Sequence, residues 1–181
     1  MKRSIIISAC VLTLVMVFLY SCKTDAPLQG NEYITTAKII ATNQSDFTID
    51  TFEYVNFNET VDNPPQHVDT IRLKANTSYS IKLQLLNEAS TPLLNLTDSI
   101  TALGDKHLMI YNMDPTSGMV AVKINDKDSK GLPLGLMSTW QAKDTTNGYL
   151  RLILHHQPGS KNGTPTPGNI DFEADYPIMV E

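Results

Sequence analysis

Residues 79–85 read Tyr79-Ser80-Ile81-Lys82-Leu83-Gln84-Leu85, an uninterrupted alternation of apolar and polar side chains. A period of two places every second side chain on one face of an extended chain, so this stretch predicts a strand with one buried face. Working outward from it, similar patterns predict eight or nine short strands, within residues 33–42, 47–57, 68–75, 79–85, 107–113, 119–125, 136–142, 149–156 and 170–180.

Turn-forming residues separate these strands. Asn147-Gly148 is the strongest hairpin signal in the chain, because both residues tolerate the positive φ angles of a tight turn. The alternation changes phase between Thr51 and Phe52, which predicts a β-bulge. The Pro- and Gly-rich stretch 157–169 predicts an exposed loop.

One short helical segment interrupts the strands. Residues 98–103 form one or two predicted helical turns, with Thr97 or Asp98 as the N-cap and Gly104 just past the end. The pattern as a whole indicates an all-β fold, an immunoglobulin-like β-sandwich of about eight or nine strands, with a small β-barrel as the alternative. A parallel sheet is not expected, because strands and helices do not alternate.

The first 22 residues have the pattern of a bacterial lipoprotein signal. Lys2 and Arg3 precede an apolar run over residues 5–20, which is shorter than the roughly 20 residues of a transmembrane helix. The run ends in Leu19-Tyr20-Ser21-Cys22, which resembles a lipobox and makes Cys22 the expected site of lipid attachment. We therefore expect a signal peptide at 1–21, a lipid-anchored tether at 22–31 and a single β-sandwich domain at 32–181.

Processing at Cys22 fixes the charge and the cysteine content of the mature chain. Lys2 and Arg3 are lost, which leaves 12 basic and 19 acidic residues and a net charge of −7. An acidic domain repels phosphate backbones, so no nucleic-acid partner is expected. Cys10 leaves with the signal and Cys22 carries lipid, so the domain has no thiol for a disulfide or a metal site.

Histidines suggest the most specific candidate chemistry. His156 is expected at the inner end of the strand over 149–156, and His107 opens another strand. If these strand ends are neighbours, His107 and His156 could share a divalent metal with a carboxylate such as Asp128 or Asp105. The simpler interpretation is that both histidines are structural residues at strand ends.

Two acidic patterns and one tryptophan allow further interpretations. Residues 126–131 resemble the start of a calcium loop, but Lys130 occupies a ligand position and Met137 stands where the final Glu belongs, so a polar turn is favoured. Asp171, Glu173 and Asp175 share one predicted face, where they would attract cations or keep an edge strand soluble. Trp140 is either a stacking surface for sugars or a core residue.

Several segments resemble a group of Bacteroidota outer-membrane lipoproteins of similar length. The likeness covers most of the mature domain and lies in residues 100–111, 126–128, 131–136, 140, 148–154, 156–158 and 171–176. It implies an outer-membrane location, periplasmic or surface-facing, and a β-rich fold, but no catalytic residue. Lys23 after the lipidated cysteine is also typical of lipoproteins sent to the outer membrane.

These observations leave three classes of function open. The first is a non-catalytic binding or accessory module, for example of an outer-membrane nutrient transporter, and it needs no cofactor. The second is a divalent-metal-capturing lipoprotein that uses His107 and His156. The third is a secreted hydrolase, which is disfavoured because the sequence has no Gly-x-Ser-x-Gly motif and no Gly-rich phosphate loop. We therefore expect a protein that is not an enzyme.

Overall fold

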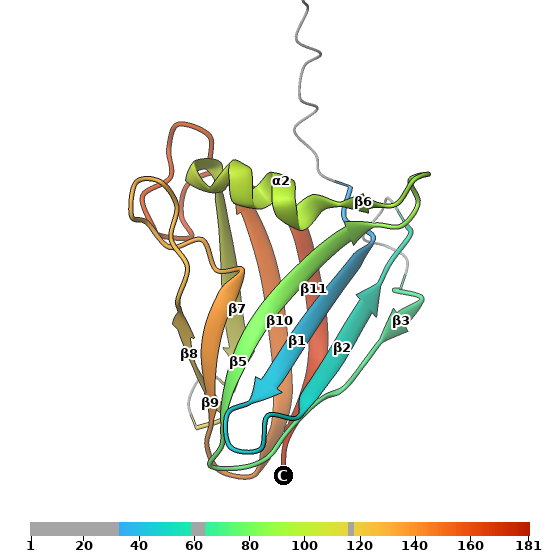
Figure 1. The fold of residues 1–181 in the computed structure, drawn as a ribbon, viewed down its shortest axis with the longest axis vertical. Helices are drawn as coiled ribbons and strands as arrows, with labels where there is room; N and C mark the ends of the chain where they lie inside the picture. Colours follow the sequence, from blue (N-terminus) through green and yellow to red (C-terminus); the bar gives the residue numbers. More distant parts are fainter. Residues whose placement is uncertain (1–32, 59–63, 116–117) are drawn as a thin grey trace, which may run out of the picture. The chain divides into compact units, whose positions relative to one another are not determined.

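Two mostly antiparallel sheets pack face to face in the computed structural model, which describes residues 33–58, 64–115 and 118–181 (Figure 1). The larger sheet has the order β3-β2-β1-β5-β9-β8, with β6 pairing to the end of β5. Its strands are β1 (Thr36–Asn43), β2 (Ile49–Val55), β3 (His67–Val68), β5 (Ser78–Asn87), β6 (Leu94–Asn95), β8 (Val120–Ile124) and β9 (Met137–Ala142).

The smaller sheet has the order β4-β11-β10-β7. Its strands are β4 (Ile71–Leu73), β7 (His107–Asp114), β10 (Thr146–His156) and β11 (Asn169–Val180). The described strands form two separate sheets, not a closed barrel, so the predicted all-β sandwich is confirmed. The signal peptide at 1–21, Cys22 and the tether at 22–31 lie outside the described residues.

The inner faces of the two sheets form one hydrophobic core. Ile81, Leu83 and Leu85 of β5 are at most 1% exposed, as their alternation predicts. Tyr54 of β2 packs against Phe172 and Tyr176 of β11, with ring centroids 5.9 and 6.0 Å apart. Aromatic contacts of this kind add to the free energy of burial and fix how the two layers lie on each other.

The predicted hairpin at Asn147-Gly148 is wrong, because both residues lie inside β10. The preceding strand, β9, belongs to the other sheet, so the connection between β9 and β10 crosses from one layer to the other. Gly148 is needed there for a different reason: a Cβ atom would lie 2.1 Å from the backbone oxygen of Asp114. Gly148 is therefore required by a close contact between two backbones, and this requirement produces the same Asn-Gly pattern as a hairpin turn.

Two other strand predictions need correction. The stretch 68–75 divides between β3, which pairs with β2, and β4, which pairs in parallel with β11. The bulge predicted near Phe52 is absent from β2, which keeps a continuous register with β1 from Ile49 to Val55. A bulge occurs instead where β11 pairs with β10, between Leu154 and His155.

A short helix, α2 (Leu96–Ala102), lies across one end of the sandwich, which we call the helix end (Figure 1). It begins two residues earlier than predicted, because the Asn95 side chain accepts a hydrogen bond from the Thr97 amide and acts as the N-cap. Ile100 is the buried residue of α2, and a 3-10 turn, η2 (Gly104–Lys106), leads into β7. The helix therefore covers part of the core where the sheets end.

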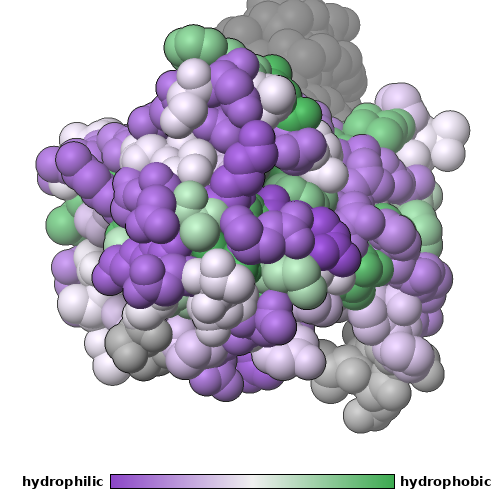
Figure 2. Space-filling model, turned by 90° about the horizontal axis from the view of Figure 1, so that it is seen from below, coloured by the Kyte–Doolittle hydropathy of each residue, from purple (hydrophilic) through white to green (hydrophobic). Residues whose placement is uncertain are grey.

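The loop after β10 also lies at the helix end and is mostly exposed, as predicted, except at its first residue. Gln157 is completely buried, and its Nε2 donates hydrogen bonds to the carbonyls of Thr164 and Pro167. These bonds tie the loop to itself. The opposite end of the sandwich, where the chain terminates, carries mostly hydrophilic side chains with only small separate apolar areas (Figure 2).

Candidate functional site

His107 and His156 lie side by side at the helix end. They are paired across β7 and β10, and their rings are nearly parallel, with centroids 5.0 Å apart and an interplanar angle of 13°. His107 is 2% exposed, whereas the side chain of His156 is 23% exposed. The structure therefore brings together the two histidines that the sequence singled out.

The carboxylate of Asp171 lies next to the two histidines because of the bulge in β11. Leu154 pairs with Phe172 and His155 pairs with Ile170, so Asp171 is the extra residue between them. Its Oδ2 lies 3.7 Å from His156 Nδ1 and 4.0 Å from His107 Nε2, and its side chain is 5% exposed. The expected outward row of three acids is wrong for Asp171, because the bulge changes the direction of its side chain.

Burial controls the charge of this cluster. It lowers the pKa of His107, and the neighbouring positive charges of Lys106 and Lys161 act in the same direction. His107 Nδ1 lies 3.0 Å from the Leu103 carbonyl, which can only accept, so Nδ1 carries the proton and Nε2 faces Asp171. Burial also raises the pKa of Asp171, although His156 opposes this effect. Neutral His107 is the favoured form at neutral pH.

The cluster is not arranged as a chelate. A metal ion lies in the plane of each imidazole that binds it, about 2.0–2.1 Å from the nitrogen. Two nearly parallel, stacked rings cannot both hold one ion in their planes, so one ring would have to turn first. Within the described ranges, no three His, Cys, Asp or Glu residues are grouped to hold a metal ion.

Asp128, the proposed third metal ligand, has a different partner. Its Oδ2 lies 2.8 Å from Lys161 Nζ, and both side chains are at most 1% exposed. Its Oδ1 accepts hydrogen bonds from the amides of Lys130 and Leu132, and Lys161 also donates to the Gly104 carbonyl. Burial alone would raise the pKa of Asp128, but Lys161 and the two amides outweigh it and lower the pKa.

The other predicted ligands also serve local structure. Asp126 accepts hydrogen bonds from the amides of Gly135 and Leu136, so the carboxylates of the calcium-like stretch hold their own loop together. Asp105 lies 3.4 Å from Lys130 in an exposed ion pair. Trp140 is completely buried and meets Tyr111 edge to face at 5.9 Å, so its ring is not available to stack on a sugar.

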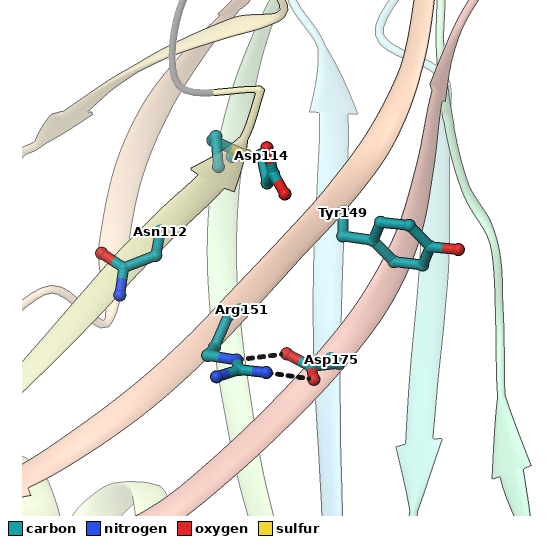
Figure 3. A pocket seen from close by; sticks show the side chains of 6 residues that line it. Asn112, Asp114, Tyr149, Arg151 and Asp175 are labelled. Atoms are coloured by element: carbon teal, nitrogen blue, oxygen red, sulfur yellow. Dashed lines mark hydrogen bonds and ion pairs between the residues drawn. The ribbon is translucent and has the colours of Figure 1, made fainter.

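The outer face of the smaller sheet carries a polar pocket that the sequence interpretation missed. Asn112 and Asp114 come from β7, Tyr149 and Arg151 from β10, and Asp175 from β11 (Figure 3). This pocket, which we call the Arg151 pocket, also includes part of Met113. Its members lie far apart in the sequence, and only the pairing of three strands brings them together.

Arg151 is held in place by two acids. Its Nε and Nη2 donate to the two carboxylate oxygens of Asp175 at 2.8 and 2.9 Å, and Glu173 lies 3.4 Å from Nε. These interactions raise the pKa of Arg151 above its usual value. The N–H groups of Nη1 have no partner among the described residues, and the neighbouring Tyr149 ring is 59% exposed. The pocket thus offers oriented donors beside an exposed aromatic ring.

Comparison of the chain with protein-family models, curated proteins and solved structures found no match. No helix in the described ranges is long and apolar enough to cross a lipid bilayer. A functional assignment therefore depends on the sequence pattern and the two sites described above.

Proposed function

We propose that this chain is an outer-membrane lipoprotein, anchored by lipid on Cys22, that acts as a non-catalytic binding or accessory module of a nutrient transporter. The lipobox-like end of the apolar run supports the anchor. The absence of nucleophile and phosphate-loop motifs from the sequence supports a role without catalysis. The domain faces either the periplasm or the cell surface.

The Arg151 pocket is the observation that carries the binding role. The two hydrogen bonds between the Arg151 guanidinium and the Asp175 carboxylate hold the guanidinium in one orientation. A ligand that accepts a hydrogen bond from Nη1 therefore loses less free energy to the ordering of this side chain. Asn112 and Asp114 add further polar groups, and Tyr149 provides an exposed ring face. This combination suits a hydroxyl-rich ligand such as an oligosaccharide, which needs both hydrogen bonds and an apolar surface.

Ligand-dependent thermal stabilisation tests the binding role. A ligand that binds only the folded state raises the melting temperature by mass action, so a matching oligosaccharide should stabilise the wild type and lose this effect in Arg151→Ala. Arg72→Ala is the matched control, since Arg72 is also half-exposed and lies 3.8 Å from an acid, Glu181. Equal stabilisation of the Arg151→Ala variant, or no response to a broad oligosaccharide panel, would contradict the proposal.

Substitution of the anchor residue tests the location separately. Cys22→Ala removes the thiol that would receive the lipid, so the variant should lack the lipid and leave the outer-membrane fraction. Membrane fractionation with metabolic labelling by a fatty acid measures both effects. A variant that still incorporates the fatty acid and stays with the outer membrane would disprove the assignment of Cys22.

A further inference from the structure

The chain enters the sandwich at the helix end, beside an apolar segment. Figure 1 shows that β1 begins at the end where α2 and β6 lie. The Thr35 amide donates to the Leu86 carbonyl, and the Glu88 amide donates to Thr35 Oγ1 at 2.8 Å. Leu94 of β6 pairs with Asn87. The segment that follows Glu88 therefore begins beside the first residues of the domain, and its other end, at β6, lies next to β5 in the same region.

This segment presents apolar side chains and no charge. Residues 89–97 read Ala-Ser-Thr-Pro-Leu-Leu-Asn-Leu-Thr, and Leu93 and Leu94 are 52% and 46% exposed. Phe57, which is 43% exposed, lies nearby, because its carbonyl accepts a hydrogen bond of 2.6 Å from the Tyr33 hydroxyl. We call Phe57, Leu93 and Leu94 the apolar rim. Leu93 and Leu94 lie on the β5–β6 side of the first described residues, and Phe57 lies on the β2 side.

We propose that the apolar rim contacts the lipid surface of the membrane to which Cys22 is attached, and so orients the domain with its helix end towards that membrane. The inference rests on the proposed lipid anchor. The nine residues 23–31 reach about 30 Å at full extension, so the entry point of the domain lies within that distance of the lipid. At that short range even a weak apolar contact is favoured, because the anchor makes the local concentration of the surface high.

The opposite end does not compete for this contact. Phe47 and Ile49 are more exposed than the rim residues, at 76% and 65%, but they lie beyond the far end of β1. The eight residues of β1 span about 25 Å, so the tether would have to be almost fully stretched to bring them to the membrane. Residues 89–97 carry no charge, so burial of apolar side chains favours the contact, whereas the acidic mature chain is repelled by anionic headgroups.

A tryptophan placed in the apolar rim reports the contact directly. Leu94→Trp is made in the full lipidated protein and reconstituted into vesicles of phosphatidylethanolamine and phosphatidylglycerol whose acyl chains carry bromine. The native Trp140 is completely buried and gives a constant background. We expect emission from the introduced indole to shift to shorter wavelength and to be quenched by the brominated lipid. Leu93→Trp is the second rim variant, and Phe47→Trp is the matched control, expected to show neither effect.

The outcomes separate this inference from the proposed anchor. If the protein is absent from the vesicles, the lipid anchor itself is wrong. If the protein is anchored but the indoles of Leu94→Trp and Leu93→Trp are quenched as weakly as that of Phe47→Trp, the anchor stands and the orientation is overturned. A shift to shorter wavelength without quenching by bromine would also overturn it, because another protein or a second copy would then cover the rim.

Discussion

The buried ion pair between Asp128 and Lys161 allows a quantitative test of the structure. Lys161→Met keeps much of the side-chain volume but removes the ammonium group, which leaves the Asp128 carboxylate buried and the Gly104 carbonyl with one donor fewer. Opposite charges 2.8 Å apart attract by roughly 6 kcal/mol at an effective dielectric constant near 20, and desolvation offsets part of this. Removal of one partner from a buried pair should therefore destabilise the protein by about 3–5 kcal/mol.

Equilibrium denaturation in urea, followed by Trp140 fluorescence, measures this loss. Lys130→Met is the matched control, because Lys130 pairs with Asp105 in the same region but is 58% exposed, so it should cost less than about 1 kcal/mol. The double variant Asp128→Asn with Lys161→Met should recover much of the loss, since it removes the unpaired charge. If Lys161→Met is no more costly than Lys130→Met, the inferred burial of this pair is wrong.

The pH dependence gives an independent check on the same pair. In the folded wild type the pKa of Asp128 lies below its usual value, so the pair stabilises the protein above about pH 4 and this contribution is lost as the pH falls further. Without Lys161, the pKa of Asp128 rises relative to the wild type, because burial is then opposed only by the two amides. The deficit of Lys161→Met should then shrink as the pH falls from 7 towards 4, whereas a deficit independent of pH would contradict the reasoning.

Three further experiments test the core, the strand contact and the histidines. Leu152→Ala removes a completely buried side chain and should cost about 2–5 kcal/mol by chemical denaturation, so an unchanged midpoint would place the wrong face of β10 inward. Gly148→Ala should cost about 1–3 kcal/mol by overpacking against Asp114, whereas the exposed neighbour Asn147→Ala should be nearly neutral. Zinc at tens of micromolar should leave the melting temperature unchanged, because the stacked rings of His107 and His156 do not form a chelate. A zinc-dependent rise that disappears in both His107→Ala and His156→Ala would support the metal function instead.

Most strands could be predicted because their signal is local. Burial of alternate side chains needs only neighbours two residues apart, so the patterns over 79–85 and 149–156 identified β5 and β10 and their inner faces. The contact between His107 and His156 could be predicted only on the condition that the two strand ends are neighbours. The pairing of β7 with β10 meets that condition.

The charged contacts could not be predicted in the same way. Asp171 faces the histidines because a bulge adds one residue to β11, and nothing in its own neighbourhood of the sequence shows that extra residue. Asp128 meets Lys161, which is 33 positions away, and Arg151 meets Asp175, which is 24 positions away. The Asp128 contact depends on which loops become neighbours in the folded chain, and the Arg151 contact depends on the register in which β10 pairs with β11.

The sequence alone therefore determined the all-β class and the side chains that enter the core, because the hydrophobic effect acts on each strand through its own alternation. The tertiary structure decided the register, the bulge and the partners of Asp128, Arg151 and Asp171, because these depend on the alignment of strands distant in sequence. A shift of one residue in that alignment would turn Arg151 and Asp175 to opposite faces and abolish the pocket.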